Sequence, residues 1–100
     1  MYETQKANKE INKLIVLLVE HNIPFEARAI NIDNEPSIQV CSPAVQSFGC
    51  DAVSHKFSYG GTEGLIEIMS LYEDDVIGWL SGEEALKYFI EAYEKESDNG

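Results

Sequence analysis

The residues of this chain that could bind a metal ion or act as a nucleophile lie close together in the sequence. Cys41, Cys50 and His55 are the soft ligands, with spacings of nine and five residues. Zinc sites usually combine paired ligands such as CxxC or HxxxH, and no such pair accompanies these three residues. Ser54 precedes His55, but neighbours on a strand point to opposite faces and cannot act as nucleophile and base. We therefore expect no metal site, no cofactor and no catalytic residue, and we predict that the protein is not an enzyme.

Two further stretches have the composition of ligand-binding loops. The sequence GGTEG at 60–64 is rich in glycine, but it lacks the lysine of a Walker motif and its Glu63 opposes an anion. A hairpin turn is the main interpretation. The alternative is a small-ligand pocket lined by Tyr59, Gly60, Glu67 and Trp79. The acidic run at 73–75 lacks the alternating ligands and the glycine of a calcium loop, so we interpret it as a solvated loop.

The elements that must position these residues centre on the stretch 51–84. Val53, Phe57 and Tyr59 alternate with polar residues, which predicts a strand whose inward side includes Val53, Phe57 and part of Tyr59. Residues 65–72 fit both a strand and an amphipathic helix. We favour a strand, because the run is short, contains two isoleucines and follows the glycine-rich turn. Its apolar residues on both faces predict a central strand.

The rest of the chain supplies two helices and further strands. Apolar spacing predicts a helix over 1–22, and two runs predict strands at 25–32 and 37–41 joined by a turn at 33–36. A short strand is predicted at 76–80. Ser81 and Glu84 have the spacing of a capping box that opens the last helix. The fold class is therefore α+β: an antiparallel sheet of four to five strands with an N-terminal and a C-terminal helix packed on one face. We expect one domain over 1–95 and a polar tail at 96–100.

Charge is large and uneven. The net charge is −11, with −2 in residues 1–50 and −9 in residues 51–100. Such a field repels nucleic-acid phosphates and anionic membranes, which argues against direct binding of either and in favour of a basic protein partner. The N-terminus is polar, and no apolar run reaches membrane-spanning length. Two cysteines do not make a disulfide framework. We therefore predict a cytoplasmic protein with free thiols at Cys41 and Cys50.

The distribution of apolar residues also bears on whether the protein self-associates. The helix is apolar nearly all round at 14–19, and an open sheet has two edges. We predict a monomer or a weak homodimer.

Part of the central stretch resembles a known family. The pattern consists of SYGG at 58–61, GL at 64–65, EIM at 67–69 and DDVIGWLSGEE at 74–84. It is similar to the pattern SYG…GLxE…DDVxGYLTxEE of small, mostly uncharacterised proteins encoded by phages and prophages of Gram-positive bacteria. Trp79 stands where that family usually has Tyr, Ser81 where it has Thr, and Gly82 departs from the pattern. The resemblance implies a phage accessory protein that works in a bacterial cytoplasm.

These observations predict a phage-encoded acidic protein that binds and inhibits a host defence protein, such as a CRISPR–Cas nuclease, by occupying a basic nucleic-acid-binding surface. The alternatives are a module that sequesters a small nucleotide and a structural or regulatory phage protein. Trp79 could be either a core anchor or a contact residue. The predicted partner-binding residues are Glu63, Glu67, Glu73, Asp74, Asp75 and Trp79.

Overall fold

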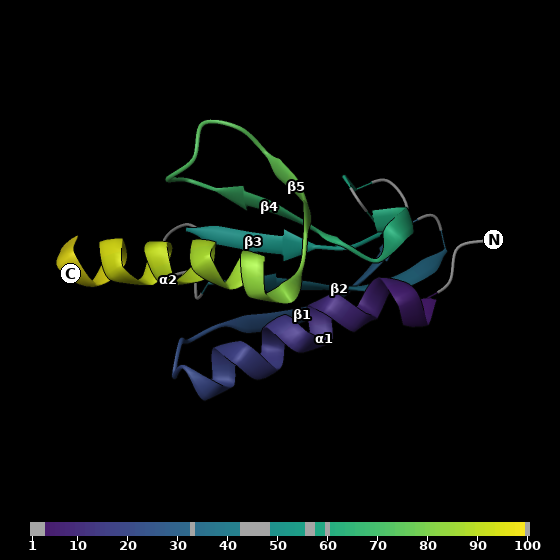
Figure 1. Ribbon diagram of the computed structural model, residues 1–100, viewed down its shortest axis with the longest axis horizontal. Helices are drawn as coiled ribbons and strands as arrows, with labels where there is room; N and C mark the ends of the chain where they lie inside the picture. Colours follow the sequence, from purple (N-terminus) through teal and green to yellow (C-terminus); the bar gives the residue numbers. More distant parts are fainter. Residues whose placement is uncertain (1–3, 33, 43–48, 56–57, 60, 100) are drawn as a thin grey trace.

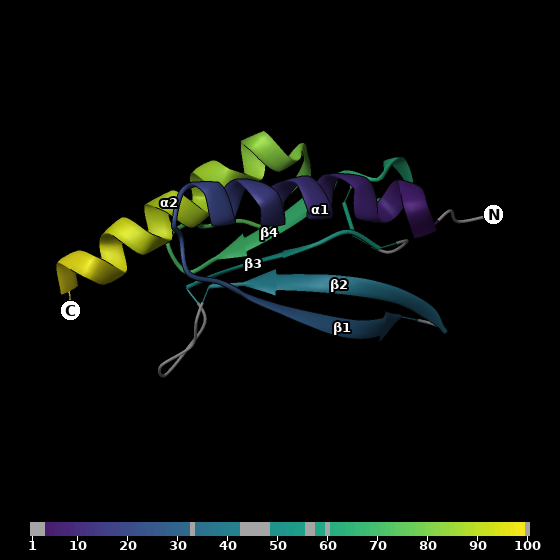
Figure 2. The same cartoon turned by 90° about the horizontal axis from the view of Figure 1, so that it is seen from below.

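The computed structural model describes residues 4–32, 34–42, 49–55, 58–59 and 61–99 and has two layers. The elements are α1 (Thr4–Glu20), β1 (Glu26–Ile32), β2 (Glu35–Cys41), β3 (Cys50–Val53), the short 3-10 helix η1 (Gly61–Glu63), β4 (Ile66–Ser70), β5 (Ile77–Leu80) and α2 (Gly82–Asn99). Both helices lie on the same face of the sheet, α1 across β2 and α2 across β3 and β4 (Figures 1 and 2). The predicted α+β class, with five antiparallel strands and the two helices on one face, is confirmed.

The sheet is a simple antiparallel meander in the order β1-β2-β3-β4-β5. Paired residues share a face, so Val40, Ala52 and Ile68 form one row under the helices. The face away from the helices is called here the open face. It carries these residues: Glu26, Arg28, Gln39, Cys41, Asp51, Val53, Glu67 and Met69.

Helix α1 buries the apolar stripe that its spacing predicts. Ile11, Leu14 and Leu18 are fully buried against the sheet. The helix ends because Asn22 adopts a left-handed φ of 57°, which lets the amide of Ile23 donate to the carbonyl of Leu18 at 2.9 Å. This is a Schellman-type stop that satisfies carbonyls left over at the end of the helix.

Helix α2 begins with the predicted capping box. The amide of Ser81 donates to Glu84 Oε1 at 3.0 Å, and the amide of Glu84 donates to Ser81 Oγ at 3.2 Å. Gly82 is explained by the neighbouring helix, because a Cβ at this position would lie 2.9 Å from the carbonyl oxygen of Glu10. Its amide also donates to the Glu10 carboxylate at 2.8 Å, which joins the start of α2 to α1. The helix continues to Asn99, beyond the end expected at residue 95.

The prediction of a strand over 53–59 is wrong, both in the residues that form the strand and in the side of the strand that is buried. The strand is Cys50–Val53, and its inward residues are Cys50 and Ala52, followed by Ser54. Val53 is half-buried on the open face, Tyr59 is 59% exposed, and Phe57 lies outside the described residues. The strand stops because Ser58 closes a turn: its hydroxyl donates to the carbonyl of His55 at 2.8 Å and accepts from the amide of His55 at 2.9 Å.

The tight hairpin turn predicted at 60–64 is also wrong. β3 ends at Val53 and β4 begins at Ile66, η1 lies between them, and Gly64 takes the positive φ, 76°, that a glycine permits. The choice of a strand for the next segment is confirmed, because β4 pairs with β3 on one side and β5 on the other. Its predicted central place in the sheet is confirmed as well.

Candidate functional site

Between its two paired positions, strand β5 contains one residue more than β4. Ile66 pairs with Leu80 and Ile68 with Ile77, so three steps along β5 match two steps along β4. This is a β-bulge, which locally bends a strand and redirects a side chain. Within it, Trp79 has a left-handed φ of 62°. Such a value is rare for a bulky residue and costs about 1–2 kcal/mol.

The residue before it explains why a tryptophan carries this conformation. Glycine usually accepts a left-handed φ, but Gly78 is needed for a close approach. A Cβ on Gly78 would lie 2.1 Å from the Cβ of Tyr59. The amide of Trp79 donates to the carbonyl of Tyr59 at 3.2 Å, which holds the two segments together. We call Tyr59, Glu67, Gly78 and Trp79 the Tyr59–Trp79 corner.

Glu67 joins this corner to the middle of the sheet. Its Oε1 accepts a hydrogen bond from the amide of Tyr59 at 3.3 Å. Glu67 lies on β4 opposite Val53, so the loop before η1 is fixed to a central strand. Burial lowers the pKa of His55 in the same loop, while the negative charge of Glu67 opposes that effect. The corner is therefore held by backbone and carboxylate contacts from three segments.

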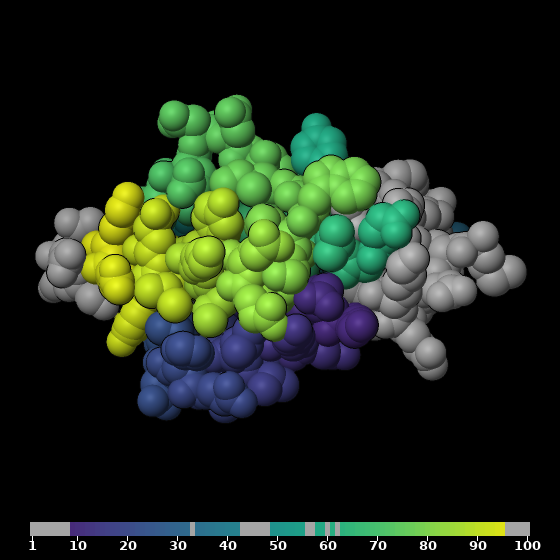
Figure 3. All heavy atoms as spheres, viewed as in Figure 1, coloured from purple at the N-terminus to yellow at the C-terminus, as the bar shows by residue number. Residues whose placement is uncertain are grey.

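The two aromatic side chains of the corner point outward. Tyr59 is 59% exposed and Trp79 is 60% exposed, and Val76 on the approach to β5 is 37% exposed. The structure thus places Trp79 outside the core. Figure 3 shows the green residues of the β4–β5 region forming one rim of the molecule beside the yellow α2.

The acidic residues predicted for partner binding do not form a single cluster. Glu63 lies in η1 before β4, whereas residues 73–75 lie in the loop after it, at the other end of that strand (Figure 1). Glu67 lies between these two ends and belongs to the corner with Trp79. Asp74 and Asp75 are exposed. Of the alternative ligand set, Tyr59, Glu67 and Trp79 come together, and Gly60 lies outside the described residues.

Glu73 differs from its two neighbours because it contacts α2. A hydrogen bond between the carboxyl groups of Glu73 and Glu91 is the main cause that raises the pKa of Glu73, and burial adds to it. Glu73 is half-buried. The first residue of the acidic loop therefore lies against α2, and only Asp74 and Asp75 are the solvated acids that the sequence predicts.

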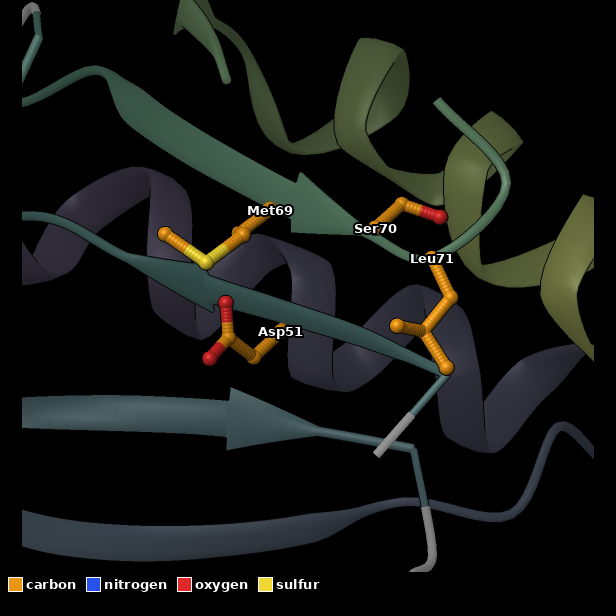
Figure 4. A pocket seen from close by; sticks show the side chains of 4 residues that line it. All are labelled: Asp51, Met69, Ser70 and Leu71. Atoms are coloured by element: carbon orange, nitrogen blue, oxygen red, sulfur yellow. The ribbon is translucent and has the colours of Figure 1, made fainter. Parts of the chain in front are cut away.

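A shallow hollow lies on the open face, away from the corner. It has a volume of about 260 Å³ and is lined by Asp51, Met69, Ser70 and Leu71. Figure 4 shows Asp51, Met69 and Leu71 on the near side of the sheet, with α1 behind it. Gln39 Nε2 donates to Asp51 Oδ2 at 3.0 Å, and burial raises the pKa of Asp51. This hollow was not predicted from the sequence, because one residue of β3 and three consecutive residues at the end of β4, all of ordinary composition, form it.

Cys41 and Cys50 are not joined by a disulfide and lie on opposite faces of the sheet. Cys50 belongs to the core under the helices, whereas Cys41 pairs with Asp51 on the open face. Both are buried, and burial raises the pKa of Cys41, which disfavours the reactive thiolate. Among the described residues, no group of three His, Cys, Asp or Glu side chains is placed to hold a metal ion.

In the described part of the chain, neither helix is long and apolar enough to cross a membrane. Comparison with known proteins found no matching family model, no matching curated protein and no matching solved structure.

The sequence analysis did not identify Gly78, which permits the close approach in the corner, or Ser58, which closes the turn before it. One signal was available, since a glycine directly before an aromatic residue in a short strand is typical of a bulge or of a close backbone approach. The hydroxyl of Ser58 gave no such signal.

Proposed function

We propose that this chain is a binding protein that acts without catalysis and uses the Tyr59–Trp79 corner to contact a basic protein partner. The observation that carries the proposal is the exposed Trp79 at a left-handed φ. Strain of this kind persists where surrounding structure enforces it and concentrates at functional positions. Since 60% of the tryptophan surface is open to solvent, the strained geometry displays the ring more than it buries it.

Tyr and Trp are the residues that most often dominate binding energy at the centre of an interface. The corner supplies one of each on a rigid base, with Glu67 beneath them and the exposed Asp74 and Asp75 in the preceding loop. The C-terminal half carries a net charge of −9, which favours a basic partner and accelerates its association. A basic surface that normally holds nucleic acid meets this description.

The resemblance to phage and prophage proteins supports a more specific form of the proposal. In that form the protein is phage-encoded, works in the bacterial cytoplasm and inhibits a host defence protein, such as a CRISPR–Cas nuclease, by occupying its nucleic-acid-binding surface. Sequestration of a small nucleotide is a second candidate, favoured by one observation: the fold brings Tyr59, Glu67 and Trp79 together.

The proposal is tested by capture from a lysate of a Gram-positive bacterium, followed by identification of the protein or nucleotide that co-purifies. Trp79→Ala should lower the affinity for a captured protein about 30-fold, which corresponds to about 2 kcal/mol for a central aromatic residue. Leu71→Ala is the matched control, since Leu71 is 66% exposed but belongs to the hollow on the open face. Equal binding by the Trp79 variant and the wild type would refute the assignment of the corner.

Charge is tested separately with Asp74→Asn/Asp75→Asn. Rim charges act mainly on the rate of encounter, so the double variant should associate more slowly with the partner at low salt. The difference should shrink at high salt, where the attraction is already screened. Glu94→Gln on the exposed side of α2 is the control. A nucleotide that binds with the same affinity at low and high salt would support sequestration instead.

A further inference from the structure

Strand β1 is an edge strand with little of the usual protection against pairing, because its two charges, Glu26 and Arg28, are of opposite sign. It has one neighbour, β2, and pairs with it over seven residues without a register shift. Exposed edges are commonly blunted by lysine, proline, a bulge or a short length. Residues 26–32 contain no lysine and no proline. In Figure 2, β1 forms the outer border of the sheet, beyond the cover of the helices.

We propose that two copies of this chain associate through β1, which pairs antiparallel with β1 of the second copy around a two-fold axis at Ala27. The two sheets then form one continuous ten-stranded sheet with the helices of both copies on the same side. This association does not depend on the proposed partner-binding function.

The hydrogen-bond pattern between β2 and its neighbours determines which amides and carbonyls of β1 face the free edge of the sheet. The amide of Ser42 donates to the carbonyl of Cys50, which fixes the hydrogen-bonded pairs between β2 and β3. Because such pairs alternate, Val40 directs its backbone groups to β3, while Gln39 and Cys41 direct theirs to β1. Their β1 partners, Arg28 and Glu26, therefore face β2. The amides and carbonyls of Ala27, Ala29 and Asn31 face the free edge.

Charge selects one register among those that this edge allows. A two-fold axis at Arg28 would place like charges opposite each other, which is destabilising. An axis at Ala29 would place Arg28 opposite Ile30 and Glu26 opposite Ile32. An axis at Ala27 places Glu26 of each copy opposite Arg28 of the other. These two side chains already form an ion pair at 3.2 Å within one chain, on the open face. The axis at Ala27 repeats that pairing twice across the seam.

The helix side of the same edge offers apolar surface to a second copy. Ala27 and Ala29 are exposed there, because α1 packs mainly against β2. Val16 and Val19 of α1 are 54% and 61% exposed. Val19 is nine residues from Glu10, two and a half helical turns, so it lies on the flank of α1 opposite the one that contacts α2. Two α1 helices on either side of the seam would cover these side chains.

The charge distribution permits this contact in an acidic protein. Residues 1–50, which include α1, β1 and β2, carry only −2 of the net −11. Two copies that meet through β1 keep their acidic C-terminal halves far apart. The corner on β5 lies at the opposite border of each sheet and stays accessible.

The test is the molar mass in solution, measured by analytical ultracentrifugation over a range of concentrations. The wild type should reach the mass of a dimer as concentration rises. Glu26→Arg alone and Arg28→Glu alone should each remain monomeric, because each places like charges across the seam. The double variant should dimerise again, and an equimolar mixture of the two single variants should form a heterodimer. A strictly monomeric wild type, or a dimer insensitive to these charges, would overturn the proposal.

Two proline variants test the edge itself. Ala27→Pro removes an outward amide at the axis and should abolish the dimer. Asn31→Pro also removes an outward amide, but outside the paired segment 25–29, and should leave the dimer intact. Both amides face away from β2, so far-UV circular dichroism should show both variants folded. If Asn31→Pro breaks the dimer, or Ala27→Pro leaves it intact, the register at Ala27 is wrong.

Discussion

The strain assigned to Trp79 can be measured by comparing Trp79→Ala with Trp79→Gly. Both variants remove the indole ring and differ only in the Cβ atom. A left-handed φ costs alanine about 1–2 kcal/mol more than glycine. A glycine also lowers the free energy of unfolding by about 0.5–1 kcal/mol relative to alanine, because it makes the unfolded chain more flexible. We therefore expect the glycine variant to be more stable than the alanine variant by about 0.7 kcal/mol, within a range of about 0–1.5 kcal/mol.

The same pair of substitutions at Met69 gives the control. Met69 is 56% exposed on β4, and its φ is not positive. There the glycine variant should be less stable than the alanine variant by about 0.5–1 kcal/mol. Subtracting the two comparisons cancels the flexibility of glycine and leaves the backbone strain at Trp79, about 1–2 kcal/mol.

The assay is urea unfolding followed by far-UV circular dichroism, because Trp79 is the only tryptophan and its fluorescence is lost in both variants. A difference of 1 kcal/mol corresponds to about 4–8 °C in Tm for a domain near this size. If alanine is more stable than glycine at both positions, the left-handed bulge is wrong, and the argument that the corner stores strain falls with it.

Three further predictions concern other contacts. Replacing a helical glycine with alanine usually raises the free energy of unfolding by about 1 kcal/mol. Gly82→Ala should instead lower it by about 1–3 kcal/mol, measured by urea unfolding, since the new Cβ would lie 2.9 Å from a backbone carbonyl oxygen of α1. Glu73→Gln should raise stability at neutral pH, because contact with Glu91 raises the pKa of Glu73 in the folded state and makes its charged form unfavourable there. The gain should vanish as the pH falls below the ordinary value near 4.5. Ser42→Ala should cost about 2–3 kcal/mol in thermal unfolding, because the buried hydroxyl accepts hydrogen bonds from two backbone amides at 3.0 Å each.

The parts of the fold that the sequence predicts are those set by local chemistry. The capping box of Ser81 and Glu84 forms as its spacing requires. The apolar stripe of Ile11, Leu14 and Leu18 is buried because helical spacing alone places it on one face. In such cases the interacting residues are only a few positions apart, so a single sequence contains the information.

The errors arose where distant segments decide the outcome. Cys50 and Ala52 do not resemble a strand core, yet they lie under the helices, whereas Val53 faces away. The alternation of larger residues after them predicted the opposite facing. The bulge at Trp79 depends on Tyr59, twenty residues away along the chain, whose close approach requires Gly78. Periodicity cannot report a contact of that kind.

The meander places the two proposed surfaces at opposite borders of the sheet. Pairing through β1 would give the strand order β5 to β1 followed by β1 to β5 of the second copy, so the two Tyr59–Trp79 corners would be nine strand spacings apart. At about 4.8 Å per spacing this is about 43 Å. A dimer of this form could hold two partner molecules, and on a surface densely coated with partner the second contact would be intramolecular. Ala27→Pro should then leave the affinity for a single partner molecule in solution unchanged and accelerate dissociation from the coated surface. If both measurements change together, β1 is itself part of the partner-binding surface, and the separation of the two functions is wrong.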